Sequence, residues 1–169
     1  MDRLPQALIL DLDQTLVDSR CARGLRDLRK WSAVAAMIPR FTIAPGAVEL
    51  GRLGDLKIAV VTKSPRTYAE SVLRHFRIRV DVLVGYHDAS PRKPHPAPTR
   101  KALQLLTVRP DEAWAAGDHP DDLESARSAG VQMLIGVSAW TDSVAALHAA
   151  KPTKTVRHPA DILALLGST

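Results

Sequence analysis

The chain has 169 residues, 46% of them hydrophobic and 24% charged, which is typical of a soluble globular protein of one domain. Its one cysteine, Cys21, excludes an internal disulfide, so a reducing cytoplasm is the expected location. The sequence has no long apolar run, which excludes a membrane-spanning helix and argues against a signal peptide. The formal net charge is +5, and residues 19–40 alone account for it, because this segment holds six basic residues and one acidic residue.

Apolar periodicity predicts helices and strands that alternate along most of the chain. In chain order we expect a strand at residues 6–12, helices at 19–38 and 47–53, a strand at 56–61, a helix at 65–76, a strand at 80–85, a helix at 99–106, a strand at 113–116, a helix from about 121 that ends against Gly130, a strand at 131–137, a helix at 142–149, an edge strand at 154–156 and a helix at 159–166. Ser64 is expected to cap the third of these helices, with Pro65 at its first position.

This alternation predicts an α/β fold: a doubly wound, Rossmann-like parallel sheet of five to six strands with helices on both faces. Residues 1–169 are expected to form a single domain. The segment at about 19–44 does not follow the alternation and is interpreted as a small helical insertion.

Polar residues follow several of the predicted strands at the carboxyl edge of the sheet, where ligands of such folds bind. Asp11 and Asp13 are two apart on the first strand, so their side chains should point the same way. Two carboxylates so close repel each other, and a divalent cation or a shared proton relieves the repulsion. Further polar residues occur after later strands and in the proline-rich loop 86–98: Thr62, Lys93, Asp118 and Asp122.

These motifs resemble those of the haloacid dehalogenase-like hydrolase superfamily, and most of all its phosphoglycolate phosphatase-like branch. The resemblance covers residues 8–137. It rests on Asp11-Leu12-Asp13-Gln14-Thr15, Val60-Val61-Thr62-Lys63, Lys93-Pro94-His95-Pro96, Gly117-Asp118 and Asp122, with the Pro45-Gly46 turn and Gly130.

The resemblance implies phosphoryl transfer through an aspartyl-phosphate. Asp11 would attack phosphorus, and Asp13 would protonate the leaving oxygen and then take a proton from water. Thr62 and Lys93 would contact the phosphoryl group. The presence of Asp13 favours phosphoryl chemistry over carbon–halogen cleavage, which needs no proton donor for the leaving halide.

The resemblance also implies a Mg²⁺ site. Asp11, the backbone carbonyl of Asp13, and Asp118 would hold the ion. Asp122 would position Lys93 or a metal-bound water, and Thr15 would hold the turn.

Several features depart from the family pattern. Lys63 stands where asparagine is commoner, and His119 follows Asp118 where serine or threonine is usual. His119 either reaches the metal shell or caps a helix or faces solvent, and we expect the cap or the solvated position. The cap is reduced to about one helix plus a connector, so the site would be open or covered by a neighbouring subunit. The basic residues of this cap either form ordinary solvated surface or attract a polyanionic substrate. Arg23 and Arg26 of the cap, and Lys63 outside it, are substrate-binding candidates.

The sequence thus predicts a cytoplasmic, magnesium-dependent phosphatase that hydrolyses phosphate monoesters. A phosphorylated small molecule is the expected substrate, and no membrane partner is expected. Two alternatives stay open: a phosphatase that acts on a nucleic-acid phosphate end, and a non-catalytic phosphate-binding regulatory domain.

Overall fold

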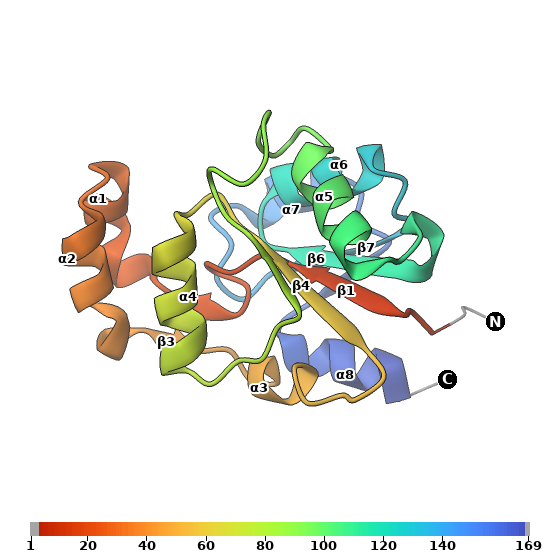
Figure 1. Cartoon of the computed structure of the whole chain (residues 1–169), viewed down its shortest axis with the longest axis horizontal. Coiled ribbons are helices and arrows are strands. Elements are labelled where there is room, and N and C mark those ends of the chain that lie inside the picture. Colours follow the sequence, from red (N-terminus) through yellow and green to blue (C-terminus); the bar gives the residue numbers. More distant parts are fainter. Residues whose placement is uncertain (1–3, 168–169) are drawn as a thin grey trace.

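The computed structural model describes residues 4–167 and has the predicted α/β architecture (Figure 1). Within these residues, six parallel strands form one sheet in the order β5-β4-β1-β6-β7-β8. The strands are β1 (Ala7–Leu10), β4 (Lys57–Val61), β5 (Val82–Val84), β6 (Ala113–Gly117), β7 (Met133–Val137) and β8 (Lys154–Val156). The prediction of a parallel, doubly wound sheet is therefore confirmed.

Helices cover both faces of this sheet. The α-helices are α1 (Arg23–Asp27), α2 (Trp31–Ala36), α3 (Ala47–Leu50), α4 (Arg66–His75), α5 (Ala97–Leu106), α6 (Pro120–Ser128), α7 (Val144–Ala149) and α8 (Pro159–Gly167). Short 3-10 turns occur at Arg20–Ala22, Ile38–Arg40 and Pro110–Glu112. Across residues 4–167, no helix is long and apolar enough to span a lipid bilayer.

The strand β1 shows how the core is divided between the two faces. Leu8 and Leu10 pack into the cluster that includes residues of α3, α4 and α8, whereas Ala7 and Ile9 pack into the cluster formed with α5, α6 and α7. Successive strand residues point to opposite faces, so a strand buried on both sides needs a continuous apolar run. This is why the run at the start of the sequence predicted the central strand.

The basic segment forms a small helical insertion beside α4 (Figure 1). A two-residue antiparallel pair, β2 (Val17–Asp18) with β3 (Thr42–Ile43), joins it to the body. The prediction of one helix over residues 19–38 is wrong: α1 ends at Asp27, Arg29 adopts a left-handed φ of 54°, and α2 starts at Trp31. The chain turns back there, and α2 packs against α4.

Candidate active site

The carboxyl edge of the sheet brings together side chains from β1, β4 and β6. Leu10 pairs with Val60 on one side and with Ala116 on the other, so the residues that follow these strands emerge next to each other. The backbone N–H of Asp11 donates to the carbonyl of Ala116 at 3.0 Å, which fixes the end of β1 against β6. Asp11, Thr62 and Asp118 therefore all line the same cleft.

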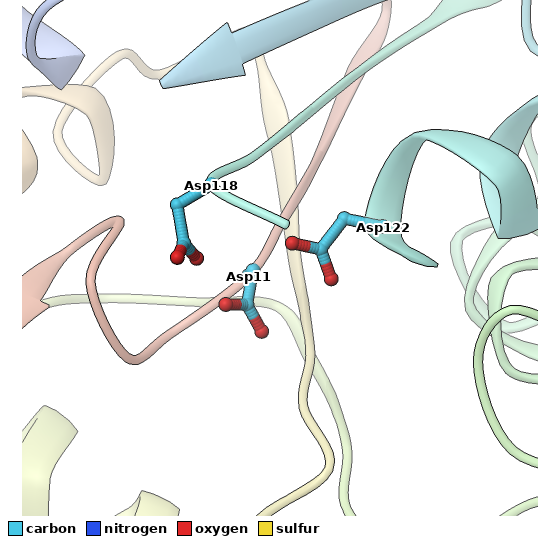
Figure 2. A group of neighbouring side chains, drawn as sticks. All are labelled: Asp11, Asp118 and Asp122. Atoms are coloured by element: carbon cyan, nitrogen blue, oxygen red, sulfur yellow. The ribbon is translucent and has the colours of Figure 1, made fainter. Parts of the chain in front are cut away.

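Three carboxylates form the centre of this cleft (Figure 2). Asp11 follows β1, Asp118 follows β6 and Asp122 lies in the first turn of α6; one oxygen from each lies within 4.8 Å of the others. Gly117 permits this approach, because a Cβ at this position would collide with the Asp122 side chain. The three carboxylates are called the carboxylate triad below.

Burial and mutual repulsion make the carboxylate triad electrostatically unfavourable by itself. Burial, followed by the nearby charge of Asp122, raises the pKa of Asp11 to about 6. Burial, followed by the charges of Asp11 and Asp122, raises the pKa of Asp118 to about 9. A cation stabilises such a group, and a set made of carboxylate oxygens suits the hard cation Mg²⁺.

Lys93 supplies one positive charge to the carboxylate triad from the loop that precedes α5. Its ammonium donates to Asp11 Oδ1 at 3.0 Å, to Asp122 Oδ1 at 2.6 Å and to the Val61 carbonyl at 2.8 Å. Burial alone would lower the pKa of Lys93, but the charges of Asp11 and Asp122 outweigh it and raise this pKa. Lys93 is therefore a fixed, charged ammonium beside Asp11.

Backbone caps and hydroxyl groups orient the other members of the carboxylate triad. At the start of α6, the His119 side chain accepts from the Asp121 N–H at 3.1 Å, and Asp122 Oδ2 accepts from the His119 N–H at 3.0 Å. His119 thus has the capping position that the sequence predicted. Thr15 Oγ1 lies 3.3 Å from Asp118 Oδ1, and Thr141 Oγ1 donates to the Asp118 carbonyl at 2.6 Å.

Asp13 lies outside the carboxylate triad and is buried among hydroxyl groups. Ser64 was expected to cap α4, but the N-cap position is Pro65, and the Ser64 hydroxyl instead donates to Asp13 Oδ2 at 2.9 Å. The Tyr68 hydroxyl donates to Asp13 Oδ1 at 2.7 Å. Burial and the Asp13 charge raise the pKa of Tyr68, so its hydroxyl keeps its proton.

The cleft has a volume of about 170 Å³. It is lined by residues 11, 13, 14, 26, 62–64, 93, 118, 119, 122 and 142. Two ion pairs lie at its rim, Lys63 with Asp121 and Arg23 with Asp142. Of the cationic residues that the sequence offered as substrate-binding groups, Lys63, Lys93 and Arg26 line the cleft, and Arg23 pairs with a residue that does.

Sequence reasoning missed several residues that shape this cleft. Tyr68 and Ser19 contact Asp13, Thr141 holds the Asp118 backbone and Asp142 forms part of the wall. The hydroxyl of Ser64 was assigned to the wrong partner. Thr141 and Asp142 follow β7 closely and could have been found by extending the carboxyl-edge argument to the fifth predicted strand; Tyr68, in the middle of a helix, carried no such signal.

Comparisons with known proteins show which family and which solved structures the chain is similar to. The family model described as haloacid dehalogenase-like hydrolase matches residues 45–136. A candidate pyrophosphatase PpaX from Caldanaerobacter subterraneus is 47% identical over 50% of this chain and 40% of its own length. Pyrophosphatase PpaX from Bacillus cereus is 34% identical over 74% of this chain and 58% of its own length. The chain thus spans about 40% to 58% of the length of these relatives.

A solved structure supports the fold independently. The candidate phosphoglycolate phosphatase from Lactobacillus plantarum superposes with a TM-score of 0.83, over 96% of this chain and 100% of that chain, at 23% identity. At this level of identity the likeness establishes a shared architecture.

Proposed function

The chain belongs to the haloacid dehalogenase-like hydrolase family, and from this premise we propose that it is a magnesium-dependent phosphatase that hydrolyses phosphate monoesters. The observation that carries the proposal is the buried Lys93 ammonium, which contacts Asp11 and Asp122 beside the third carboxylate, Asp118. A fixed positive charge next to Asp11 supports nucleophilic attack, because it offsets the repulsion between this carboxylate and a phosphate dianion.

The proposed reaction has two balanced steps. In the first, an Asp11 oxygen bonds to phosphorus while the bond from phosphorus to the leaving oxygen breaks. The electron pair of that bond goes to the leaving oxygen, which takes a proton from Asp13. In the second, a water oxygen bonds to phosphorus, Asp13 takes the water proton, and the bond from phosphorus to Asp11 breaks. Phosphate is released and both carboxyl groups return to their starting states.

The other residues bind and orient in this scheme. Lys93 and Thr62 hold phosphoryl oxygens, and Asp122 holds Lys93 through the contact at 2.6 Å. Asp11, Asp118 and Asp122, with the Asp13 backbone carbonyl, would hold Mg²⁺; their oxygens fit the preference of this ion. When bound, Mg²⁺ supplies positive charge that favours the approach of the nucleophile to the phosphoryl group.

The size and charge of the cleft favour a small phosphorylated molecule. The volume of about 170 Å³ suits a phosphoryl group with a short attached segment. Three basic residues of the insertion, Arg20, Arg23 and Arg26, each pair with a carboxylate of the protein. This pairing leaves less free positive charge for a nucleic-acid end, so that alternative is less well supported.

Pyrophosphate is a second candidate substrate. The Bacillus cereus relative is named a pyrophosphatase, and Lys63, whose side chain is 47% exposed, lines the cleft where it would contact a leaving phosphate. The same two chemical steps apply, with phosphate as the leaving group.

Release of inorganic phosphate tests the proposed function directly. With Mg²⁺ present, the purified protein should release phosphate from 4-nitrophenyl phosphate, and excess EDTA should lower the rate at least about a hundred-fold. Pyrophosphate and a 5′-phosphorylated oligonucleotide in the same assay compare the substrate classes. Absence of release from all three at any Mg²⁺ concentration, or a rate that EDTA leaves unchanged, would refute the proposal.

Mg²⁺ should also stabilise the fold in a pH-dependent way. The pKa values of Asp11 and Asp118 are raised from 3.8 to about 6 and about 9. In the metal-free protein, the protonated forms of these two groups contribute fully to the free energy of unfolding below about pH 4. That contribution is lost as the pH rises through their pKa values in the folded protein. Protons therefore compete with the cation at low pH.

Thermal melting at two pH values measures this competition. At pH 8, Mg²⁺ near a hundred times its Kd should raise the Tm by about 5 °C, and the increase at pH 5.5 should be less than about half of that. Asp118→Asn, which removes one carboxylate, serves as the matched variant and should show a smaller increase at pH 8. An increase that is independent of pH would contradict binding at the carboxylate triad.

A further inference from the structure

Asp13 receives four polar contacts from other side chains. Ser19 Oγ and the Tyr68 hydroxyl donate to Oδ1 at 2.5 and 2.7 Å, and Ser64 Oγ donates to Oδ2 at 2.9 Å. The guanidinium of Arg26 lies 3.4 Å from Oδ1. Oδ1 is therefore anchored by three groups and Oδ2 by one, which fixes the rotation of the carboxylate.

Tyr68 is itself held in place by aromatic packing. Its ring centroid lies 5.4 Å from that of Trp31 in α2 and 6.5 Å from that of Phe41. Both neighbours belong to the insertion between β2 and β3, and Tyr68 belongs to α4 of the main body. The orientation of the Tyr68 hydroxyl therefore depends on the packing of the insertion against α4.

Arg26 reaches Asp13 from the other part of the insertion, α1. It contacts Asp13 directly and also donates to Ser19 Oγ at 2.8 Å, the hydroxyl that in turn donates to Asp13. The arginines three residues before and after it hold α1 to two other loops: Arg23 pairs with Asp142, and the Arg29 guanidinium lies 5.6 Å from the Tyr86 ring centroid. Arg23 at the start of α1, Arg26 within it and Arg29 in the turn that follows thus connect this part of the insertion to the body.

We propose that Tyr68 and Arg26 are positioning residues, which hold the Asp13 carboxylate in the orientation from which it exchanges a proton with the leaving oxygen and then with water. The inference rests on the proposed function, since that function gives Asp13 its proton-transfer role. Among the described residues, Ser64 is the one side chain that donates to Oδ2, so Oδ2 is the oxygen with capacity to carry the proton. The reduced cap then contributes to the chemistry through Arg26 and through the packing of Tyr68.

The dependence on the leaving group separates a positioning role from a structural one. A 4-nitrophenolate leaves readily without a proton, whereas phenolate needs protonation far more. A misaligned Asp13 should therefore slow phenyl phosphate more than 4-nitrophenyl phosphate. A general loss of folded protein would slow both equally.

Tyr68→Phe is the first test, because it removes the hydroxyl and keeps the ring beside Trp31 and Phe41. With saturating Mg²⁺ and pre-steady-state release of the phenol as the readout, we expect the rate for phenyl phosphate to fall at least about ten-fold. The rate for 4-nitrophenyl phosphate should fall less than about three-fold, and KM should stay within about two-fold. Ser71→Ala is the matched control, since Ser71 lies on the same helix and its hydroxyl donates to the Thr67 carbonyl.

Arg26→Gln is the second test and keeps the inference falsifiable if Tyr68→Phe folds poorly. It should show the same selective loss for phenyl phosphate, and Arg26→Lys should restore part of it. Arg20→Gln, which removes an equal charge from the exposed pair with Asp18, is its control. The Tm of each variant is measured alongside.

The outcomes are distinct. A selective loss for phenyl phosphate in both variants, absent from both controls, supports the inference. Equal losses on the two esters, or no loss, would overturn it while the phosphatase proposal stands. Absence of phosphate release by the parent protein from either ester would overturn the proposed function and this inference with it.

Discussion

Replacement of Asp11 by asparagine should lower phosphate release by at least about 10⁴-fold, because the amide keeps the shape of the side chain and removes the attacking oxygen charge. The fold should survive. Burial and the charge of Asp122 act against the ionised form of Asp11, so a neutral amide relieves repulsion within the metal-free carboxylate triad. The expected combination is an inactive protein with an unchanged or higher Tm in EDTA.

The measurement is phosphate release from 4-nitrophenyl phosphate, with parent and variant purified in parallel. Asp55→Asn makes the same chemical change at an exposed position and should keep the parent rate. Activity of Asp11→Asn within about ten-fold of the parent would show that another group is the nucleophile.

Replacement of Lys93 by methionine should damage both stability and activity. The Lys93 side chain is 5% exposed and is bound to Asp11 and Asp122. Removal of its charge leaves two largely buried carboxylates, with side chains 12% and 9% exposed, without their common partner. We expect a cost of about 3–5 kcal/mol in the free energy of unfolding of the metal-free protein. The rate should fall at least about a thousand-fold, since a fixed charge near the phosphoryl oxygens is lost as well.

Urea unfolding in EDTA measures the change in the free energy of unfolding. Lys63→Met is the matched control for stability, because Lys63 pairs with Asp121 at the rim of the cleft and its side chain is 47% exposed. The control should change the free energy of unfolding by less than about 1 kcal/mol. Mg²⁺ should recover part of the stability of Lys93→Met. If the two variants unfold at the same urea concentration, Lys93 does not stabilise the carboxylate triad.

Most of the fold could be predicted from the sequence, because a doubly wound sheet has a strong pattern. Strands buried on both faces appear as continuous apolar runs, and each was located to within a few residues. The insertion was harder to predict. Residues 19–38 are divided by a turn in which Arg29 adopts a left-handed φ of 54°, between the end of α1 and the start of α2, and no local sequence pattern marks that turn. The β2 and β3 strands, two residues each, are too short to carry a period.

The candidate site, too, could be predicted from the sequence only in part. Residues at strand ends could be placed together because parallel strands present their carboxyl ends at one edge. The hydrogen-bond partners of Asp13 could not be predicted in this way. Tyr68 lies in a helix whose apolar stripe gives no sign that one phenol faces a carboxylate, and the Ser64 hydroxyl had an equally good expected role as a helix cap. Which partner each of these hydroxyls contacts depends on how α4 is rotated against the sheet and the insertion.

The central place of β1 in the sheet has a consequence for the order in which the protein matures. Ala7 pairs with Lys57 on one side and with Ala113 on the other, so the middle of the sheet joins the first tenth of the chain to segments made much later. Such non-local pairing is slow to form, because long loops must close first. A nascent chain on the ribosome carries Asp11 long before Asp118 has been synthesised. The carboxylate triad would then be assembled at a late stage of folding, once β6 has added to β1.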